Sequence, residues 1–307
     1  MTRAFRNVLL PLGASLTLLI TAGVQRLASD AGTGDRSEDE VCRIPGPSTT
    51  LPAEVRETSG LAQSRRHPHV VWTHNDSGND AVLFGIDSAG AMVARVPVSG
   101  VTTLDWEDLA LGPCGEGNCL YIADIGDNAR IRETISVYLV PEPALEAKEV
   151  APLRRIEARY PDGAQDAEAL FVLPDGRMHI VTKGRHGVIG LYRFPAGSAS
   201  SDGVVTLERV RDLLPRPRTQ LDRVTSAAAN RDGRWVAIRT YRTLYLYAAE
   251  GLQSTSGPAP LTYDLRTLRE RQGESVTFTD SGELRLTSEA EKRRDLPTMA
   301  RLQCDLP

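Results

Sequence analysis

The sequence has little of several features that would point to particular classes of protein. Its 307 residues carry a net charge of only −4, so no general positive field favours nucleic acid as a partner. No G-x-S-x-G elbow occurs, which disfavours a serine hydrolase. Helix patterns are few, and the best of them, PEPALEAKEV at residues 141–150, is short. With 41% hydrophobic and 25% charged residues, the composition is that of an ordinary globular protein.

Cysteine is scarce, and its four positions suggest bridges. Cys114 and Cys119 flank GEGN at a predicted hairpin tip, whereas Cys42 and Cys304 lie at the two ends of the predicted folded region. Four cysteines permit three pairings, of which we prefer Cys114–Cys119 with Cys42–Cys304. No second pair has the spacing of zinc ligands, and free thiols are disfavoured in an exported protein.

The longest apolar run is slightly short for a comfortable membrane span. Residues 8–24, VLLPLGASLTLLITAGV, follow Arg3 and Arg6, which is the order of a secretory signal. We therefore expect a secreted or cell-surface protein that touches a membrane only through residues 8–24, if the signal is not cleaved. The predicted segments are a signal peptide or N-terminal anchor over 1–28, a flexible linker over 29–41 and a single domain over 42–307.

What the sequence does contain is an internal repeat. Five segments can be aligned on their third residue, which is Ser, Thr or Glu in each. They are ETSGLA (57–62), DWEDLA (105–110), DAEALF (166–171), RVTSAA (223–228) and QGESVT (272–277), with Ser59, Glu107, Glu168, Thr225 and Glu274 in the aligned column. The column residues are 48, 61, 57 and 49 positions apart. Strand-rich repeats of roughly 40–50 residues are typical of propeller blades.

The rest of each repeat fits a four-stranded sheet. Eight residues after the column, Gly176, Gly233 and Gly282 lie in hairpin-turn sequences. Four repeats are nearly complete, and the fifth lacks its last strand, which IPGPSTTL (44–51) can supply from the N-terminal side. We predict an all-β fold, a β-propeller of five blades whose ring is closed by an N-terminal strand and locked by Cys42–Cys304. Six blades are the alternative, if the long second and third repeats hide another sheet.

Acidic residues gather where the channel of a propeller would lie. The first strand of each blade borders the channel, and residues two apart on a strand face the same way. The column two positions earlier contains Glu57, Asp105, Asp166, Arg223 and Gln272. The two columns together hold six carboxylates, which is costly where water is scarce. Pairing with Lys183, Arg185, Arg239 or Arg242, a bound Ca²⁺, or raised pKa values are three remedies, and plain hydrogen bonding to the neighbouring blade is the structural alternative.

These patterns yield three sets of candidate residues. The candidate Ca²⁺ ligands are Glu57, Asp105, Glu107, Asp166 and Glu168, with the amide oxygen of Asn75 or Asn128 in addition. The loops after the second strands, THNDSGND (73–80), ADIGDN (123–128), TKGRHG (182–187), RTYR (239–242) and TSEAE (287–291), predict a ligand-binding mouth with Asn75, Asp76, Asp124, Asp127, Asn128, Lys183 and Arg239. Such runs are also good turns. If the protein is an enzyme, His74 beside Asp76, Asp105 or Glu107 is the best general-base candidate.

Three stretches carry a resemblance to known proteins. ETSGLAQSRRHPHVVWTHNDSG, DWEDLALGP and YIADIGDN…VYLVPEP resemble a group of exported actinobacterial and other bacterial β-propellers without an established activity, over about residues 43–307. More distantly, the layout is similar to TolB-like propellers and to calcium-dependent lactonases and esterases of the gluconolactonase and paraoxonase kind. That resemblance implies a Ca²⁺ at the channel floor, with Glu57, Asp105, Glu107 and Asp166 as the matching type of residue. Since the predicted blade count is lower here, the resemblance supports a metal more than lactone hydrolysis.

Two functions follow as hypotheses. The first is a non-catalytic, exported and monomeric propeller that binds a small molecule or a protein at the channel mouth, with Ca²⁺ in the acidic channel. The alternative is a Ca²⁺-dependent hydrolase of an ester, lactone or phosphoester, in which the ion polarises the substrate and His74 or a carboxylate acts as the base.

Overall fold

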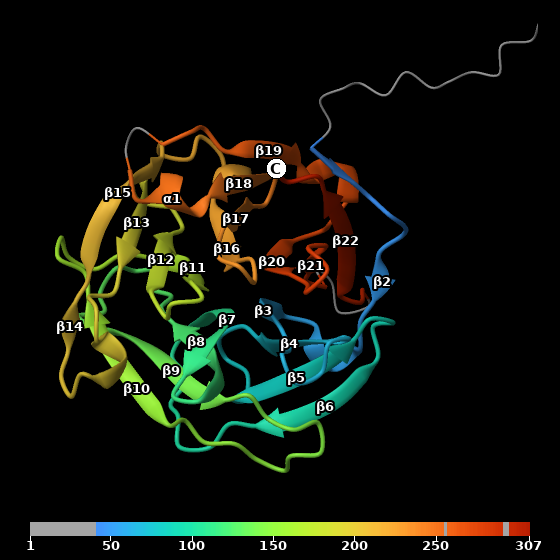
Figure 1. Cartoon of the computed structure of the whole chain (residues 1–307), viewed down its shortest axis with the longest axis horizontal. Helices are drawn as coiled ribbons and strands as arrows, with labels where there is room; N and C mark the ends of the chain where they lie inside the picture. The colour runs from blue at the N-terminus through green and yellow to red at the C-terminus, as the bar shows by residue number, and fades with distance from the viewer. Residues whose placement is uncertain (1–40, 255–256, 291–294) are drawn as a thin grey trace, which may run out of the picture. The chain divides into compact units, whose positions relative to one another are not determined.

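Five β-sheets surround one central axis in the computed structural model of the chain (Figure 1). The structure describes residues 41–254, 257–290 and 295–307, so the predicted signal or anchor (1–28) and nearly all of the predicted linker (29–41) lie outside the described residues. All of these described residues belong to one compact unit. The fold is a five-bladed β-propeller, as the repeat predicts, and the six-bladed alternative is wrong.

Each of the first four blades is built around four strands in chain order, with the first strand innermost. Blade 1 contains β3 (Thr58–Gln63), β4 (Val70–Asn75), β5 (Val82–Asp87) and β6 (Met92–Pro97). Blade 2 contains β7 (Trp106–Cys114), β8 (Gly117–Asp124), β9 (Ile135–Pro141) and β10 (Arg154–Arg159). Blade 3 contains β11 (Ala167–Val172), β12 (Met178–Thr182), β13 (Ile189–Arg193) and β15 (Glu208–Leu214). Blade 4 contains β16 (Val224–Ala229), β17 (Trp235–Thr240), β18 (Thr243–Ala248) and β19 (Leu261–Asp264).

The extra length of the third repeat comes from a short additional strand and not from a sixth blade. Its short strand β14 (Val205–Thr206) pairs in parallel with β10 and so extends the outer edge of blade 2. Residues 141–150, where the sequence suggested a helix, form no helix, because Pro141 and Pro143 remove backbone donors from a segment that is too short to be stable as a helix alone. In the described part of the chain the one α-helix is α1 (Ala249–Leu252), and four 3₁₀ turns occur, η1 (Ala53–Val55), η2 (Ser198–Ser200), η3 (Gln220–Asp222) and η4 (Leu265–Leu268).

Blade 5 closes the ring with strands from both ends of the folded chain. It contains β20 (Gly273–Phe278), β21 (Leu284–Ser288) and β22 (Thr298–Cys304), to which β1 (Cys42–Arg43) and β2 (Thr49–Thr50) add an outer edge. Cys42 lies opposite Cys304 in the register and is bridged to it. The predicted closure and both predicted disulfides, including Cys114–Cys119, are confirmed.

The hydrophobic core is divided into five clusters, one between each pair of neighbouring blades. Trp72 and Leu83 of blade 1, for example, pack against Trp106 and Ile122 of blade 2. Equivalent clusters lie between the other pairs of neighbours, including blades 5 and 1. A blade therefore buries its two faces only by means of its neighbours, which is why the ring must be complete. No helix in the described segments is long and apolar enough to cross a membrane.

Candidate functional site at the channel mouth

The five column residues lie together around the channel entrance, as predicted. Each is near the start of an innermost strand, and these strands line the centre of the ring (Figure 1). In blades 2 to 5 the column residue is the extra residue of a β-bulge, and in blade 1 the bulge falls one position later, at Gly60. Bulges turn a side chain away from the regular alternation, and here they accompany side chains that are at most 6% exposed, Ser59, Glu107, Glu168, Thr225 and Glu274.

The two hydroxyl members of the column have a structural role. Ser59 Oγ donates to the backbone carbonyl of Glu107 in the next blade, and Thr225 Oγ1 donates to that of Gly273 at 3.3 Å. Hydrogen bonding to the neighbouring blade therefore explains Ser59 and Thr225, whereas the acidic members of the column need another explanation.

Asp76, Asp105 and Glu107 form the tightest group of carboxylates among the described residues. One oxygen from each lies within 4.8 Å of the others. Gly126 packs against them so closely that a Cβ at this position would lie 2.2 Å from Glu107 Oε1 and 2.4 Å from Asp105 Oδ2. Burial raises the pKa of Asp76 and Asp105, and burial together with repulsion from Glu168 and Asp76 raises the pKa of Glu107 well above its ordinary value. The group therefore attracts positive charge.

The other predicted ligands lie outside this group. Glu168 is paired with Lys183, and although burial opposes the charge on Lys183, the carboxylates of Glu168 and Glu107 raise its pKa. Asp166 accepts a hydrogen bond from the Asp127 amide at 3.3 Å through Oδ1, and its buried Oδ2 has no partner. Glu57 accepts from Asn79 Nδ2 at 2.7 Å. Of the four basic residues expected to neutralise the columns, Lys183 is the one that pairs with a column carboxylate.

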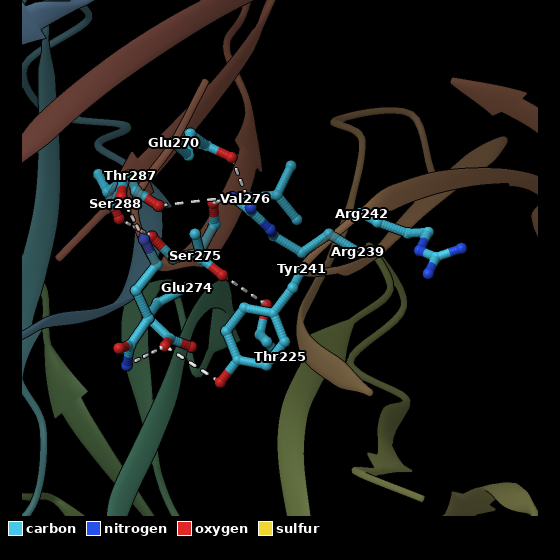
Figure 2. Close-up of polar contacts among 12 residues, drawn as sticks. Thr225, Arg239, Tyr241, Arg242, Glu270, Glu274, Ser275, Val276, Thr287 and Ser288 are labelled. Carbon is cyan, nitrogen blue, oxygen red and sulfur yellow. Dashed lines mark hydrogen bonds and ion pairs between the residues drawn. The ribbon is translucent and has the colours of Figure 1, made fainter. Parts of the chain in front are cut away.

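Blade 5 completes the mouth with two further acids. Gln272 Nε2 donates to Glu274 Oε1 at 2.8 Å and to Glu289 Oε2 at 2.9 Å. Tyr241 Oη donates to Glu274 Oε1 at 3.3 Å (Figure 2). Burial raises the pKa of Glu274 to about 7, and burial with repulsion from Glu274 and Asp76 raises that of Glu289 to about 9. The sequence placed Glu289 in the predicted mouth loop TSEAE (287–291) without singling it out as a site residue, and residue 291 lies outside the described residues. Glu289 follows the second strand of its blade, as Asp76 does in blade 1.

Most of the other predicted mouth residues hold their own loops in place. Asp124 pairs with Arg132 at 2.8 Å and accepts from the Leu104 amide at 3.0 Å. Asp127 accepts from the amides of Ile131 and Arg132 at 3.0 and 2.8 Å. Asn75 donates to the Glu54 carbonyl at 2.8 Å, and Asn128 is exposed and accepts from Arg185. The contacts of these four residues stabilise the loops themselves, which is the role expected of residues in turns.

Two predicted residues are fully buried. The ring of His74 packs edge-on against Trp106, its Nδ1 lies 2.9 Å from the Asn75 carbonyl, and burial lowers its pKa. Arg239 donates to the Ser275 carbonyl at 3.0 Å and pairs with Glu270 at 2.8 Å, so it joins blade 4 to blade 5 (Figure 2). Neither side chain is open to solvent at the mouth.

The face around the mouth also exposes apolar side chains. Loops that precede a first strand or follow a second strand all lie on this face, because strands alternate in direction within a blade. Five of the nine exposed large apolar residues of the described chain lie in such loops, namely Leu104, Ile131, Val188, Leu221 and Leu296. Exposed apolar side chains near a charged entrance are typical of a binding face.

Comparisons with known proteins locate the chain among propellers. No protein-family profile and no curated protein sequence matches it. Among solved structures, it is similar to the major allergen Mala s 1 of Malassezia sympodialis, with 9% identity, a TM-score of 0.57, and coverage of 84% of this chain and 96% of the allergen. The likeness concerns the fold alone. The PQQ-bound aldose sugar dehydrogenase of Streptomyces coelicolor has 10% identity and a TM-score of 0.45, with coverage of 85% of this chain and 98% of the dehydrogenase. The predicted resemblance to propellers is thus confirmed at the level of the fold.

The mouth acids predict that the metal-free protein loses stability as the pH rises. Glu274 and Glu289 keep their protons in the folded protein up to a pH of about 7 and about 9, whereas a Glu in the unfolded chain loses its proton near pH 4. Because the folded state then binds more protons, the free energy of unfolding should fall by a few kcal/mol between pH 6.5 and 9. Thermal unfolding in EDTA across this range measures it.

The matched control for this pH dependence is the double variant Glu274→Gln/Glu289→Gln. It should show a flatter dependence, since neither amide titrates. A melting temperature of the original protein that stays constant or rises from pH 6.5 to 9 would contradict the raised pKa values of these two acids.

Proposed function

We propose that this protein is an exported binding propeller that holds a divalent cation, Ca²⁺ in preference, on Asp76, Asp105 and Glu107, and takes a small molecule or a protein at the same channel mouth. The observation that carries the proposal is the convergence of these three carboxylates, from two blades, within 4.8 Å of one another. The predicted ligands Asp105 and Glu107 belong to this group, and Asp76 joins them in place of Glu57, Asp166 and Glu168.

The donor set suits Ca²⁺ in chemistry and in size. Ca²⁺ binds carboxylate oxygens at about 2.3–2.6 Å, so two ligands on opposite sides of one ion are about 4.8 Å apart. Gly126 has no Cβ, which lets the carboxylates of Glu107 and Asp105 lie directly against its backbone. A bound cation would offset the repulsion among the acids and hold them in the charged form. It would also present an open, positively charged point to an oxygen of a ligand.

The surroundings support a location outside the cytosol and a partner other than nucleic acid. Two disulfides and no free cysteine in the described chain are typical of an oxidising compartment. Export through residues 8–24 and a monomeric state belong to this proposal. The acids of the mouth would repel a phosphate backbone, whereas the exposed apolar loops around them favour a small molecule or a protein.

Calcium should raise the melting temperature of the purified protein. At a Ca²⁺ concentration about a hundred times its dissociation constant, the expected gain is about 2.7 kcal/mol, or at least about 5 °C for a domain of this size. Asp76→Asn and Glu107→Gln should each remove most of this shift, because each deletes a charged ligand. Differential scanning calorimetry with Ca²⁺ and with EDTA measures it.

Glu57→Gln provides the matched control, since Glu57 lies at the same mouth but outside the triad. It should retain the shift. A protein that Ca²⁺ does not stabilise would refute the metal site, and a loss in Glu57→Gln as large as that in Asp76→Asn would show a diffuse attraction for cations instead of a site.

Ca²⁺-dependent hydrolysis of an ester, lactone or phosphoester is the second candidate. It is favoured by Glu274, whose pKa of about 7 suits a group that exchanges a proton near neutral pH. His74, the base expected from the sequence, is fully buried against Trp106. A panel of esters and lactones assayed with Ca²⁺ separates the candidates: turnover that is lost in Asp105→Asn and Glu274→Gln supports hydrolysis, and a thermal shift without turnover supports binding.

A further inference from the structure

A pocket rich in arginine opens beside the acidic mouth, between blades 4 and 5. Its volume is about 380 Å³. Its walls come from the turn between β17 and β18, from η4 and from the segment that leads into β20, all on the face of the mouth. Four arginines line it, Arg242, Arg266, Arg269 and Arg271, together with Gln220, Tyr241 and Gln272 among its polar residues.

The carboxylates near these arginines neutralise them only in part. Arg242 pairs with Asp222 at 3.3 Å, and Arg266 pairs with Asp264. The guanidinium of Arg269 forms no hydrogen bond or ion pair with any described residue. Arg269 also has a φ of +54°, a backbone conformation that side chains other than glycine rarely adopt. Arg269 thus adds to the wall of the pocket a positive charge that no described residue pairs with.

The one acid in the lining is paired with an arginine that does not line the pocket. Glu270 is bound through Oε2 to Nη2 of Arg239 at 2.8 Å, and its side chain is only 6% exposed (Figure 2). Its charge is therefore used in the buried joint between blades 4 and 5. The pocket keeps a positive surface, although the channel beside it is strongly negative.

We propose that this pocket binds an oxyanion, the carboxylate or phosphate group of a small ligand. Guanidinium groups recognise both groups through paired N–H···O bonds, and several arginines around one cavity repel one another until an anion is present. The remaining lining suits a small polar ligand, because Tyr241 and Gln220 add further polar groups and Leu221 an apolar contact.

The pocket shares a wall with the acidic mouth. Tyr241 and Gln272 line it and at the same time donate hydrogen bonds to Glu274. Figure 2 shows the contact between Tyr241 and Glu274. A ligand with its oxyanion among the arginines would thus extend across these two residues towards the carboxylates and the cation of the mouth. That orientation rests on the proposed function, whereas the oxyanion site itself rests only on the pocket and its arginines.

Isothermal titration calorimetry with inorganic phosphate and with succinate tests the site. The titrations use the purified protein at low salt in EDTA, so that a failure of the metal proposal does not affect the result. Both anions should bind, and 1,4-butanediol, which has no charge, should not. Arg269→Gln and Arg242→Gln should each weaken binding about tenfold or more, because each removes a charged donor pair.

Arg234→Gln is the matched control. Arg234 pairs with Asp232, two residues before it, just as Arg266 pairs with Asp264. Unlike Arg266, it lies in the turn between β16 and β17, on the face of the propeller opposite to the mouth. The control should bind both anions as the original protein does. Absence of binding in the original protein, equal binding in Arg269→Gln and Arg242→Gln, or an equal loss in Arg234→Gln would each overturn the proposal. Since the Arg269 side chain is exposed and has no partner among the described residues, its replacement should leave the fold intact, and a melting curve verifies this.

Discussion

Asp108→Ala is expected to lower the free energy of unfolding by about 5 kcal/mol. The Asp108 side chain lies fully buried among the first strands and accepts hydrogen bonds from three backbone amides, those of Leu109 and Leu170 at 2.9 Å and of Ala227 at 3.1 Å. Ser226 Oγ donates to it at 3.1 Å and accepts from the Val276 amide at 3.2 Å. Alanine would leave three buried amides without a partner, each costing about 1–3 kcal/mol.

The chemical nature of the group at position 108 can be separated from its shape. Burial raises the pKa of Asp108 to about 8, so its carboxyl group is mostly protonated near neutral pH. A neutral side chain of the same shape therefore removes little charge. Asp108→Asn should therefore lose much less than Asp108→Ala, and Ser226→Ala should lose about 1 kcal/mol. Urea unfolding measures all three. Equal losses for the alanine and asparagine variants would contradict a role based on accepted hydrogen bonds.

Asp108 also shows what the sequence could and could not reveal about the centre of the ring. At the equivalent position the other repeats have Gly60, Ala169, Ser226 and Ser275, all small residues. A lone carboxylate among small residues is a signal that the repeat alignment contains, and it marks a residue on the axis. Apart from the adjacent Leu109 amide, its partners could not be predicted, because they come from blades 3 and 4 and the contacts exist only once the ring has closed.

The fold itself was accessible because its signals are local. Each repeat motif and each turn glycine, such as Gly176 and Gly233, depends on a few neighbouring residues, and the spacing of the repeats and the positions of Cys42 and Cys304 can be read directly along the chain. These features were enough to predict five blades and the way in which the ring closes.

The candidate site was accessible only in part, since side-chain pairing depends on register. Asp105 and Glu107 were selected from the columns, but their grouping with Asp76 depends on the loop after β4. Arg239 was expected at the mouth because it lies near the end of β17. Side chains alternate between the two faces of a strand, and at this position the side chain enters the joint with blade 5.

The resulting mouth is electrically asymmetric. Acids come from blades 1, 2, 3 and 5, whereas blade 4 contributes Thr225 and Tyr241 and borders the arginine pocket. A cation on the side of blades 1 and 2 and an oxyanion on the side of blades 4 and 5 would place opposite charges across one entrance. Such an arrangement orients a polar ligand, because reversing it would bring like charges together.

The double variant Cys42→Ser/Cys304→Ser is expected to lower the free energy of unfolding by about 4–5 kcal/mol. The bridge joins residues 262 positions apart, and in the chain-entropy account a loop of this length yields the largest stabilisation. The strand that it anchors is short, since β1 pairs with β22 through only two residues. Without the bridge, β1 and β2 should separate from β22 and expose a sheet edge.

Cys114→Ser/Cys119→Ser is the matched control, because its bridge spans only five positions within one hairpin. The same account predicts a loss of about 2 kcal/mol there, with no opening of the ring. Hydrogen exchange gives the local readout: amides of β22 should exchange faster in the Cys42 and Cys304 variant and remain protected in the control. Equal losses of stability in the two variants, or unchanged protection of β22 in the first, would mean that pairing and packing at the seam hold the propeller closed without the covalent link.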